Sequence, residues 1–600
     1  MPEMEEKLNR FVRMNQEERT RLRGLERQFS MIAFLRGVVF LAALALTLIG
    51  AKDGIPWLLA PGILLFFGFV LLVKKHADVD ALTERVKSME RVTQDYVARF
   101  HDDWHKFPEH GGEYLGPDDV VAADLDLLGP NSLYQLIHVC HTDEGCYRLA
   151  SLLRRPEKAT GTEERRTAVE ELVTREEFAV KFEAAGRIAA GRKKRPDITG
   201  FENYCKAEQP GLPVGMQIAR FAGPVLFFSL LALGLFDVIS LGFCLIAFLI
   251  QLSVALVLKP ASDRIILPVY GISHSTEDYL TMLSMIAVEE FSSKRMTTLR
   301  EKIMGGQGIL AAFRRLAAIS QLYNVSFNPL IHQILSGVFF WDFHLAAMVT
   351  NWHAKYGAAA ADCFYVIAET EVLLSLAVPG MVRETARAEI TEDEKVMISC
   401  EELVHPLIDP EKAVGNSATF KDGVTIVTGS NMSGKTTFLR TLAINLILAD
   451  LGAPICGKRL RASRMRIFTS MRIKDDVAGG ISTFYAEILR IKAMADYRKE
   501  NRPMLCLIDE IFKGTNSADR ICGAEHAIKS LSGGNSIVIV STHDFELCDL
   551  TDDAGHSANN LHFEESYEND VLTFDYKVKP GRCTTTNARE LLRMAGFSIS

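Results

Sequence analysis

Apolar residues are unevenly distributed along this 600-residue chain, and their longest runs lie in its first half. Gly54 to Val73 is twenty residues without a charge, and Val238 to Leu258 is twenty-one. Each run is long enough to cross about 30 Å of hydrocarbon as a helix. A shorter apolar run precedes each of them, at Gly37 to Ala51 and at Phe221 to Phe236. The pattern predicts two transmembrane helical hairpins, with pairs of buried core helices as the alternative.

Charges that flank the two hairpins, over residues 31–75 and 219–258, predict their orientation. The loops inside the hairpins carry only Lys52 with Asp53, and Asp237. Lysines and arginines gather instead outside the hairpins, at Arg21, Arg23, Arg27, Arg36, Lys74, Lys75, Arg192, Lys193, Lys194, Arg195, Arg220, Lys259 and Arg264. Because cytoplasmic flanks are enriched in these residues, both hairpins are expected to enter from the cytoplasm and return to it. The prediction is a multi-pass protein of the plasma (inner) membrane whose N-terminus and soluble domains are cytoplasmic.

Outside the two hairpins, the segments before residue 396 are predicted to be helical. Residues 1–30 alternate acidic and basic side chains at helical spacing, which predicts a cytoplasmic N-terminal helix. Residues 76–218 predict a linker helix and the first part of a helical domain. Residues 259–395 predict its second part, because apolar residues recur there at three- and four-residue spacing with few turn signals. The second hairpin therefore interrupts one helical domain.

Residues 396–600 have a different pattern. Short β-rich apolar runs alternate there with helical stretches, at Val424–Thr428, Met504–Ile508 and Ser536–Ser541. Such alternation predicts an α/β domain around a largely parallel sheet.

The composition of the whole chain argues against two classes of protein. The net charge of −8 argues against a generally basic, nucleic-acid-coating surface. Eleven cysteines without CxxC spacing indicate neither a zinc site nor a disulfide framework.

A phosphate-binding loop follows the first of these strands. Its sequence matches GxxxxGK[ST] between a predicted strand and a predicted helix, which is the context that the motif requires. Backbone N–H groups of such a loop wrap the phosphates, and the helix presents its positive N-terminal end to them. Lys435 is expected to reach the β- and γ-phosphates of ATP, and the Thr436 hydroxyl to ligate Mg²⁺. The predicted ATP-binding residues are Gly429, Ser430, Asn431, Met432, Ser433, Gly434, Lys435, Thr436 and Thr437.

Two acids and a histidine end the next two strands. Asp509 and Glu510 follow an apolar strand, which places Asp509 near the Mg²⁺ shell and Glu510 near the attacking water. His543 lies at the end of the following strand, at the same sheet edge, and is expected near the γ-phosphate or its water. The predicted catalytic residues of this Mg-dependent ATPase are Glu510 and His543, and the predicted Mg²⁺ ligands are Thr436 and Asp509.

The residues around these motifs resemble the MutS mismatch-repair ATPases. The segments that carry the resemblance are Gly429 to Thr437, Asp475-Asp476 with Ser482-Thr483-Phe484, Ile508 to Ile511 with Gly514-Thr515, and Ser541 to Leu547. Upstream, Asp124 to Gly129 resembles the opening of the MutS core domain. His405-Pro406-Leu407 and Asn416 also lie where that family has such residues before its P-loop. The resemblance covers residues 118–218 and 260–600.

The resemblance implies an ABC-type P-loop ATPase domain preceded by an all-α lever domain like the MutS core. In this family two subunits close around composite nucleotide sites. Ser482 and Thr483 would then face the nucleotide of the partner subunit, and Asn431 would help to position the γ-phosphate and water. The expected protein is a membrane-anchored homodimer that binds and hydrolyses ATP to move its levers.

This sequence departs from the family pattern at three places. Only residues 76–117 separate the first hairpin from the core-like segment, so the mismatch-recognition domains of the family are not expected here. The second hairpin interrupts the region that forms the levers and the DNA clamp. Ala413 stands where the family has an aromatic residue that stacks on adenine. Whether the levers contact DNA is left open, and any binding is expected to be non-specific and directed at the backbone.

Two other functions compete with this one. Leu531 to Asn535, Leu-Ser-Gly-Gly-Asn, is similar to the LSGGQ signature of ABC transporter ATPases. It follows Asp509, whereas the transporter signature precedes that acid, so it is expected to end a helix and turn the chain into the strand at Ser536. The other alternative is a membrane scaffold switch that acts on a protein partner. A catalytically idle scaffold is disfavoured because the chain retains all of Lys435, Thr436, Asp509, Glu510 and His543.

Overall fold

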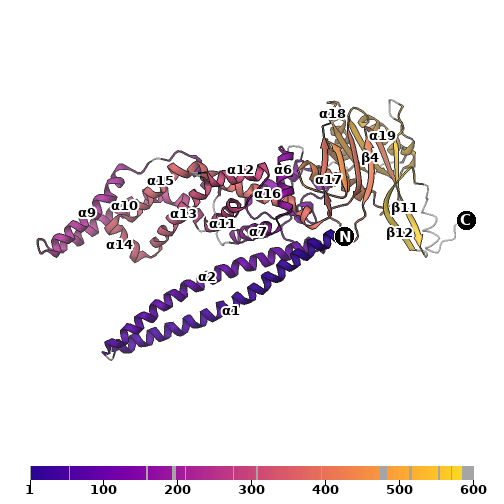
Figure 1. The fold of residues 1–600 in the computed structure, drawn as a ribbon. Coiled ribbons are helices and arrows are strands. Elements are labelled where there is room, and N and C mark those ends of the chain that lie inside the picture. The colour runs from indigo at the N-terminus through magenta and orange to yellow at the C-terminus, as the bar shows by residue number, and fades with distance from the viewer. Residues whose placement is uncertain are drawn as a thin grey trace.

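The computed structural model describes most of the chain. The described residues are 2–52, 54–156, 160–191, 198–209, 211–273, 276–305, 308–392, 395–430, 432–472, 483–512, 517–551, 555–568 and 571–583. A helical region leads into a C-terminal α/β domain (Figure 1). A long N-terminal hairpin diverges from the helical region, and its tip lies at the opposite end of the molecule from the α/β domain.

The N-terminal hairpin consists of α1 (Pro2–Lys52) and α2 (Pro56–Phe100). Its charged half packs against the helical region. There the Ser88 hydroxyl of α2 donates to the Ala184 carbonyl of α7 (Glu176–Ala190) at 2.9 Å. Within the hairpin the rings of Phe11 and Tyr96 stack with centroids 4.6 Å apart. Its apolar half leaves large side chains uncovered, as Phe34 shows with 75% of its surface exposed. The charged N-terminal segment and the first apolar run therefore form one continuous helix.

The helical region is organised around one buried helix. α16 (Cys363–Val382) is buried along almost its whole length and mostly apolar, as expected of a helix at the centre of a core. The other elements of the region are η1 (Asp103–Lys106), η2 (Gly112–Tyr114), α3 (Val120–Asp124), α4 (Leu133–Ile137), α5 (Asp143–Arg154), α6 (Thr162–Val173), α7 (Glu176–Ala190), α8 (Ile198–Lys206), α11 (Thr276–Val288), α12 (Lys294–Met304), α13 (Ile309–Asn324), η4 (Val325–Phe327), α14 (Pro329–Phe339) and α15 (Trp341–Ala361).

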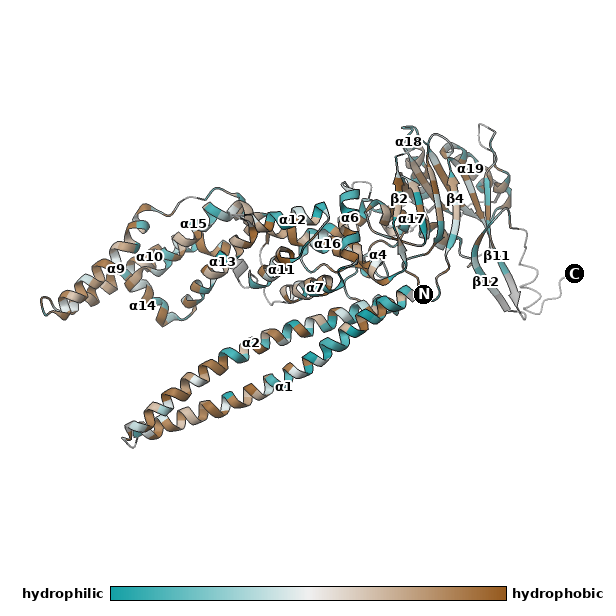
Figure 2. Ribbon diagram, viewed as in Figure 1, coloured by the Kyte–Doolittle hydropathy of each residue, from teal (hydrophilic) through white to brown (hydrophobic). Residues whose placement is uncertain are grey.

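A second apolar hairpin, α9 (Val214–Leu235) and α10 (Gly242–Ser273), extends from the far end of this region. Within the described part of the chain, five helical stretches are long and apolar enough to cross a membrane. In the stretches of α1, α2, α9 and α10, between 6% and 22% of the most apolar window is buried, whereas in Trp341–Val382 the share is 94%. Burial therefore separates a pair of core helices from four exposed apolar helices, whose hydrophobic halves are visible in Figure 2.

The α/β domain is built on a six-stranded sheet of order β12-β11-β5-β10-β9-β8, in which all neighbours are parallel except β11 and β12. Its strands are β5 (Gly423–Thr428), β8 (Arg466–Ser470), β9 (Met504–Asp509), β10 (Ser536–Thr542), β11 (Asn559–Glu568) and β12 (Val571–Pro580). The helices of the domain are α17 (Lys435–Asp450), α18 (Thr483–Arg498), α19 (Ser517–Leu531) and η5 (Phe545–Asp549). The largely parallel sheet predicted from the sequence is present.

A smaller sheet of order β2-β7-β3-β4 accompanies it. Its strands are β2 (Ala388–Thr391), β3 (Met397–Leu403), β4 (Asn416–Lys421) and β7 (Arg459–Ser463). A short pair, β1 (Thr385–Ala386) and β6 (Ile455–Cys456), lies where α16 leads into the α/β domain. The buried helix of the helical region thus continues directly into the second domain.

The first junction between the two regions is formed by the Asp-Leu-Asp segment that follows α3. Asp124 is buried and accepts the backbone N–H groups of Met471 and Arg472, both at 3.1 Å. Asp126 pairs with Arg440 of α17 at 3.0 Å and also with the Arg472 guanidinium. These two carboxylates therefore tie the helical region to α17 and to the chain that leaves β8.

The second junction lies at the carboxyl end of α17. The last carbonyls of a helix have no partner within the helix, and α6 supplies partners for them here. The Thr162 hydroxyl donates to the Asp450 carbonyl at 2.9 Å, and the Arg165 guanidinium donates to the Leu451 carbonyl at 3.3 Å. The helical region consequently contacts α17 at both ends.

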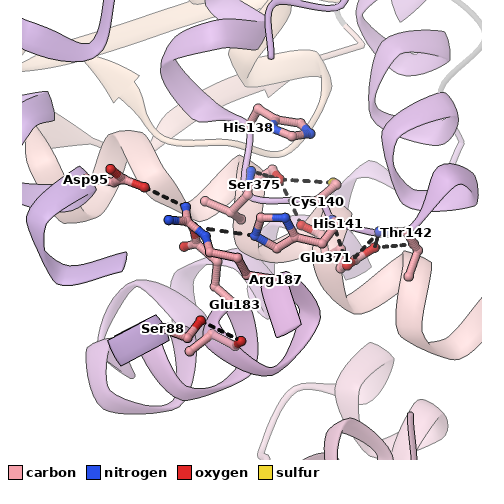
Figure 3. Close-up of polar contacts among 12 residues, drawn as sticks. Ser88, Asp95, His138, Cys140, His141, Thr142, Glu183, Arg187, Glu371 and Ser375 are labelled. Atoms are coloured by element: carbon pink, nitrogen blue, oxygen red, sulfur yellow. Dashed lines mark hydrogen bonds and ion pairs between the residues drawn. The ribbon is translucent and has the colours of Figure 1, made fainter. Parts of the chain in front are cut away.

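A buried polar cluster fastens α16 to its neighbours (Figure 3). The Glu371 carboxylate of α16 accepts the His141 N–H at 2.9 Å, the Thr142 N–H and the Thr142 hydroxyl. Nearby, Arg187 of α7 donates to Asp95 of α2 at 2.5 Å, so the cluster also reaches the N-terminal hairpin. Burial raises the pKa of the Glu371 carboxyl to about 8, against the effect of the hydrogen bonds that it accepts.

The raised pKa of Glu371 predicts a pH-dependent stability. The carboxyl has a pKa of 4.5 in the unfolded chain and of about 8 in the folded protein, so between these values the folded protein holds one more proton. The free energy of unfolding therefore falls as pH rises through that window, by up to about 1.4 kcal/mol per pH unit. Glu371→Gln removes this contribution. Thermal unfolding in detergent should show wild type losing more stability between pH 5.5 and 8 than the variant. Equal losses would contradict the assignment, and Glu177→Gln, on the exposed face of α7, is the matched control.

Candidate nucleotide site

The loop between β5 and α17 takes the shape that its glycines permit. Gly429 has a φ of 146°, and a Cβ there would lie 2.9 Å from the Phe563 carbonyl oxygen. Gly434, just before the helix, has a φ of 108°. Both backbone conformations are rare for residues with a side chain. The spacing of the glycines in the motif is therefore required by the turn from strand to helix.

Lys435 is the first residue of α17 and is held over this loop. Its ammonium group donates to the Gly429 carbonyl at 2.7 Å and to the Ser430 carbonyl at 2.8 Å. Burial lowers the pKa of Lys435, and the nearby carboxylates of Glu510 and Asp509 act in the opposite direction. The group is thus a cation placed at the N-terminal end of a helix, where phosphate oxygens are bound.

Thr436 and Asp509 meet beside the lysine. The Thr436 hydroxyl donates to both oxygens of the Asp509 carboxylate at 3.0 Å, and the Ser541 hydroxyl of β10 also donates to that carboxylate. A hydroxyl and a carboxylate are hard oxygen ligands, and one or two protein ligands suffice for Mg²⁺ when phosphates and water supply the rest. The residues therefore fit the Mg²⁺ site predicted from the sequence.

Glu510 and His543 face one another across the ends of β9 and β10. The His543 Nε2 lies 3.1 Å from a Glu510 carboxylate oxygen and 3.4 Å from the Lys435 ammonium nitrogen. Glu510 has a φ of 53°, an uncommon conformation for a residue with a side chain. Its N–H donates to the Ser541 carbonyl at 2.9 Å, which holds the strained residue in place. Glu510 thus lines the same pocket as Lys435, and His543 lies within contact distance of both.

This pocket has a volume of about 320 Å³ and contains a group that the sequence did not single out. Tyr576 of β12 lines it together with Ala413, His405 and the P-loop residues. Asn416 fixes the strand that carries the tyrosine, since its amide donates to the Tyr576 carbonyl at 2.9 Å. The pocket that Ala413 lines is therefore also lined by an aromatic residue, from a strand that lies far away in the sequence.

Glu565 is a second residue that the sequence did not single out. Its carboxylate, on β11, accepts the hydroxyl hydrogen of Ser430 in the P-loop. No motif marks either Glu565 or Tyr576. Only the pairing of β11 beside β5, and of β12 beside β11, brings them to the loop.

Three of the predicted site residues cannot be placed in this pocket from the described side chains. Asn431 and Ser482 lie outside the described residues, and Thr483 is described only as the first residue of α18. The Leu-Ser-Gly-Gly-Asn segment ends α19 at Leu531, and the chain then turns through Gly533 and Gly534, both with positive φ, into β10. The prediction that this segment ends a helix and turns the chain into the strand at Ser536 is confirmed. The turn lies at the N-terminal end of β10, at the opposite edge of the sheet from the P-loop.

Comparison with known proteins agrees with this geometry. Residues 425–599 match the family model described as MutS domain V. A DNA mismatch repair protein MutS 2 of Halobacterium salinarum is 32% identical over 201 residues, 32% of this chain and 23% of that protein. A second MutS 2, of Haloarcula marismortui, is 34% identical over 177 residues, 29% and 18% of the two chains. The Thermus thermophilus protein MutS is 29% identical over 245 residues, 40% and 29%. The matched segment is thus less than a third of each relative.

The position of Tyr576 predicts that its ring contacts the base of a bound nucleotide. Tyr576→Ala should weaken ATP binding about tenfold, equivalent to about 1.4 kcal/mol, because an aromatic ring contributes both area and stacking. Tyr576→Phe should bind like wild type. Titration calorimetry with ATP measures this, and Phe574→Ala, two residues along the same strand, is the control. Unchanged affinity in Tyr576→Ala would place the base elsewhere.

Proposed function

We propose that this chain, whose C-terminal domain belongs to the MutS family, is a membrane-anchored, Mg-dependent ATPase that moves its helical region as it binds and hydrolyses ATP. The observation that carries the ATPase part is the convergence of five side chains at one site: three line the pocket, and Asp509 and His543 contact those three. Lys435 and Thr436 come from α17, Asp509 ends β9, and Glu510 and His543 directly follow β9 and β10. Segments far apart in sequence supply one constellation for phosphoryl transfer.

Each side chain has a chemical role in this proposal. The Lys435 ammonium neutralises charge on the β- and γ-phosphates. Thr436 and Asp509 would hold Mg²⁺, which when bound would neutralise charge on the phosphate oxygens. The Glu510 carboxylate accepts a proton from the attacking water, and His543, 3.1 Å away, orients that carboxylate. The catalytic geometry therefore depends on the contact between Glu510 and His543.

Glu510→Gln tests the assignment of the base. The amide keeps the size of the side chain but cannot accept the proton, so hydrolysis should slow by roughly a hundredfold or more while ATP affinity stays near the wild-type value. Phosphate release and calorimetry measure the two quantities separately. Glu546→Gln, in the neighbouring helix η5, should hydrolyse at the wild-type rate. A Glu510→Gln protein as fast as wild type would exclude Glu510 as the base.

The proposed homodimer rests on the family and on the segment that contains Ser482 and Thr483. Sites of this type are completed across two subunits, so slow hydrolysis should trap the closed dimer. Light scattering of Glu510→Gln in detergent should give about twice the monomer mass with ATP and a lower mass without it. A monomer mass under saturating ATP would refute the homodimer but would not contradict the proposed nucleotide site.

The membrane part of the proposal is supported by exposed apolar surface. The apolar halves of α1 and α2 and most of α9 and α10 are uncovered, at an energetic cost in water of about 25 cal/mol per Å². The short helix α14 adds Leu330 and Ile334 to this surface beside α9 and α10. Figure 1 shows the tips of both hairpins at the same end of the molecule, away from the α/β domain. One bilayer could therefore cover both.

Cysteine labelling tests both insertion and orientation. Val238, in the loop between α9 and α10, is exposed, and Lys259 lies at the other end of the apolar run. Val238→Cys should react with a membrane-impermeant maleimide added outside intact cells, whereas Lys259→Cys should react only after the cells are opened. The unsubstituted chain gives the background from its own cysteines. Equal reaction of both variants from outside, or a full-length protein that stays soluble without detergent, would refute the membrane anchor.

DNA and a transport substrate are not part of the proposal. The relatives are named DNA mismatch repair proteins, but the family model covers only the C-terminal domain of this chain. In the helical region the described α9 and α10 form a single exposed hairpin rather than a packed bundle around a pathway. The observations therefore favour a membrane-attached ATPase with a moving helical region over a DNA-binding protein and over a transporter.

A further inference from the structure

A second pocket, remote from the P-loop, lies between α5, α6, α12 and α16. It has a volume of about 730 Å³, which is in the size range of small-molecule sites. Its lining includes Tyr147, Tyr365 and an unusual number of guanidinium groups, those of Arg148, Arg154, Arg155, Arg165 and Arg295. Arginines at this density are the residues that recognise phosphate groups in proteins.

Carboxylates neutralise only part of this charge. Arg148 pairs with Glu144, Arg154 with Asp119, and Arg295 with Glu369. Arg155 and Arg165 have no carboxylate partner within the described residues. Among the described residues, the five guanidinium groups of the pocket therefore pair with three carboxylates, which leaves two positive charges in excess.

Arg165 is the more informative of the two, because it is buried. Only 4% of its surface is exposed. Its Nη groups donate to two backbone carbonyls, those of Leu451 at 3.3 Å and Thr160 at 2.8 Å, while its Nε has no partner. Burial lowers the pKa of this guanidinium and the nearby charge of Arg295 lowers it further, while the Glu369 carboxylate, which is paired with Arg295, acts in the opposite direction. A buried cation next to a like charge is unfavourable unless an anion accompanies it.

We propose that this pocket binds a small ligand through a phosphate or pyrophosphate group, at a site separate from the P-loop. The doubly charged phosphate would balance Arg155 and Arg165, and Arg295 lines the same pocket. The exposed ring of Tyr147 offers an apolar face to the remainder of such a ligand. This inference does not depend on ATP hydrolysis or on the membrane anchor.

The place of the pocket gives such a ligand a route to the nucleotide site. Arg165 is also the residue that donates to the Leu451 carbonyl at the end of α17, and α17 begins with the P-loop lysine. Arg295 and Glu369 belong to α12 and to the central helix α16. A phosphate held here would therefore contact the element that joins α17 to the helical region.

The experiment uses the full chain in detergent with Lys435→Ala as the background, because that change removes phosphate binding at the P-loop. Inorganic pyrophosphate is titrated by calorimetry. The background protein should bind it, and adding Arg155→Gln or Arg295→Gln should weaken binding at least tenfold. Arg155 is exposed, so its substitution does not threaten folding. Arg502→Gln, on the surface of the α/β domain, should leave the affinity unchanged.

Three results would overturn the proposal. The first is the absence of pyrophosphate binding in the Lys435→Ala background. The second is an equal loss in Arg502→Gln and Arg155→Gln, which would show attraction to general surface charge. The third is binding of a single-stranded oligonucleotide, lost in Arg155→Gln, by a protein that does not bind pyrophosphate. That result would assign the pocket to a nucleic-acid backbone instead of a small ligand.

Discussion

The attachment of α17 at both ends is the constraint on which the rest of the structure depends. Near its N-terminus, Arg440 pairs with Asp126 of the helical region. At its carboxyl end, Thr162 and Arg165 of α6 bind its last carbonyls. Because this helix begins with Lys435, a displacement of the P-loop cannot remain local unless these contacts break. An interior that is packed at crystal-like density transmits such a shift instead of absorbing it.

The same contacts define a path to the exposed hairpins. α16 is buried at the centre of the helical region and continues into the α/β domain through β1. Its Glu371 belongs to the polar cluster that also includes α7 and, through Arg187 and Asp95, α2. The other end of α2 is the exposed apolar part of the N-terminal hairpin. A change at the nucleotide site can therefore reach the exposed apolar surface of the N-terminal hairpin, which we propose lies in the membrane, through contacts within one molecule.

The sequence was sufficient to predict the parts of this account that are local in the chain. Lys435 and Thr436 follow a strand directly, and Asp509 and Glu510 end one, so motif and position coincide. Tyr576 and Glu565 could not be predicted in this way, because only strand pairing brings them to the P-loop. Hydropathy predicted the exposed hairpins correctly as apolar helices. Trp341–Val382 is also long and apolar enough to span a membrane, and only its burial in the structure identifies it as core. The Asp124 to Gly129 segment was recognised by resemblance, while its contacts with Arg440 and Met471 required the structure.

The central claim is that the nucleotide site and the helical region move together through α17. Hydrogen exchange of the Glu510→Gln protein in a bilayer disc, with and without ATP, measures this most directly. The account predicts that ATP protects amides around the P-loop and, in addition, those of α6 and of residues 120–129 outside the α/β domain. Protection confined to residues 425–599, with α6 and residues 120–129 exchanging at the same rate in both states, would contradict it.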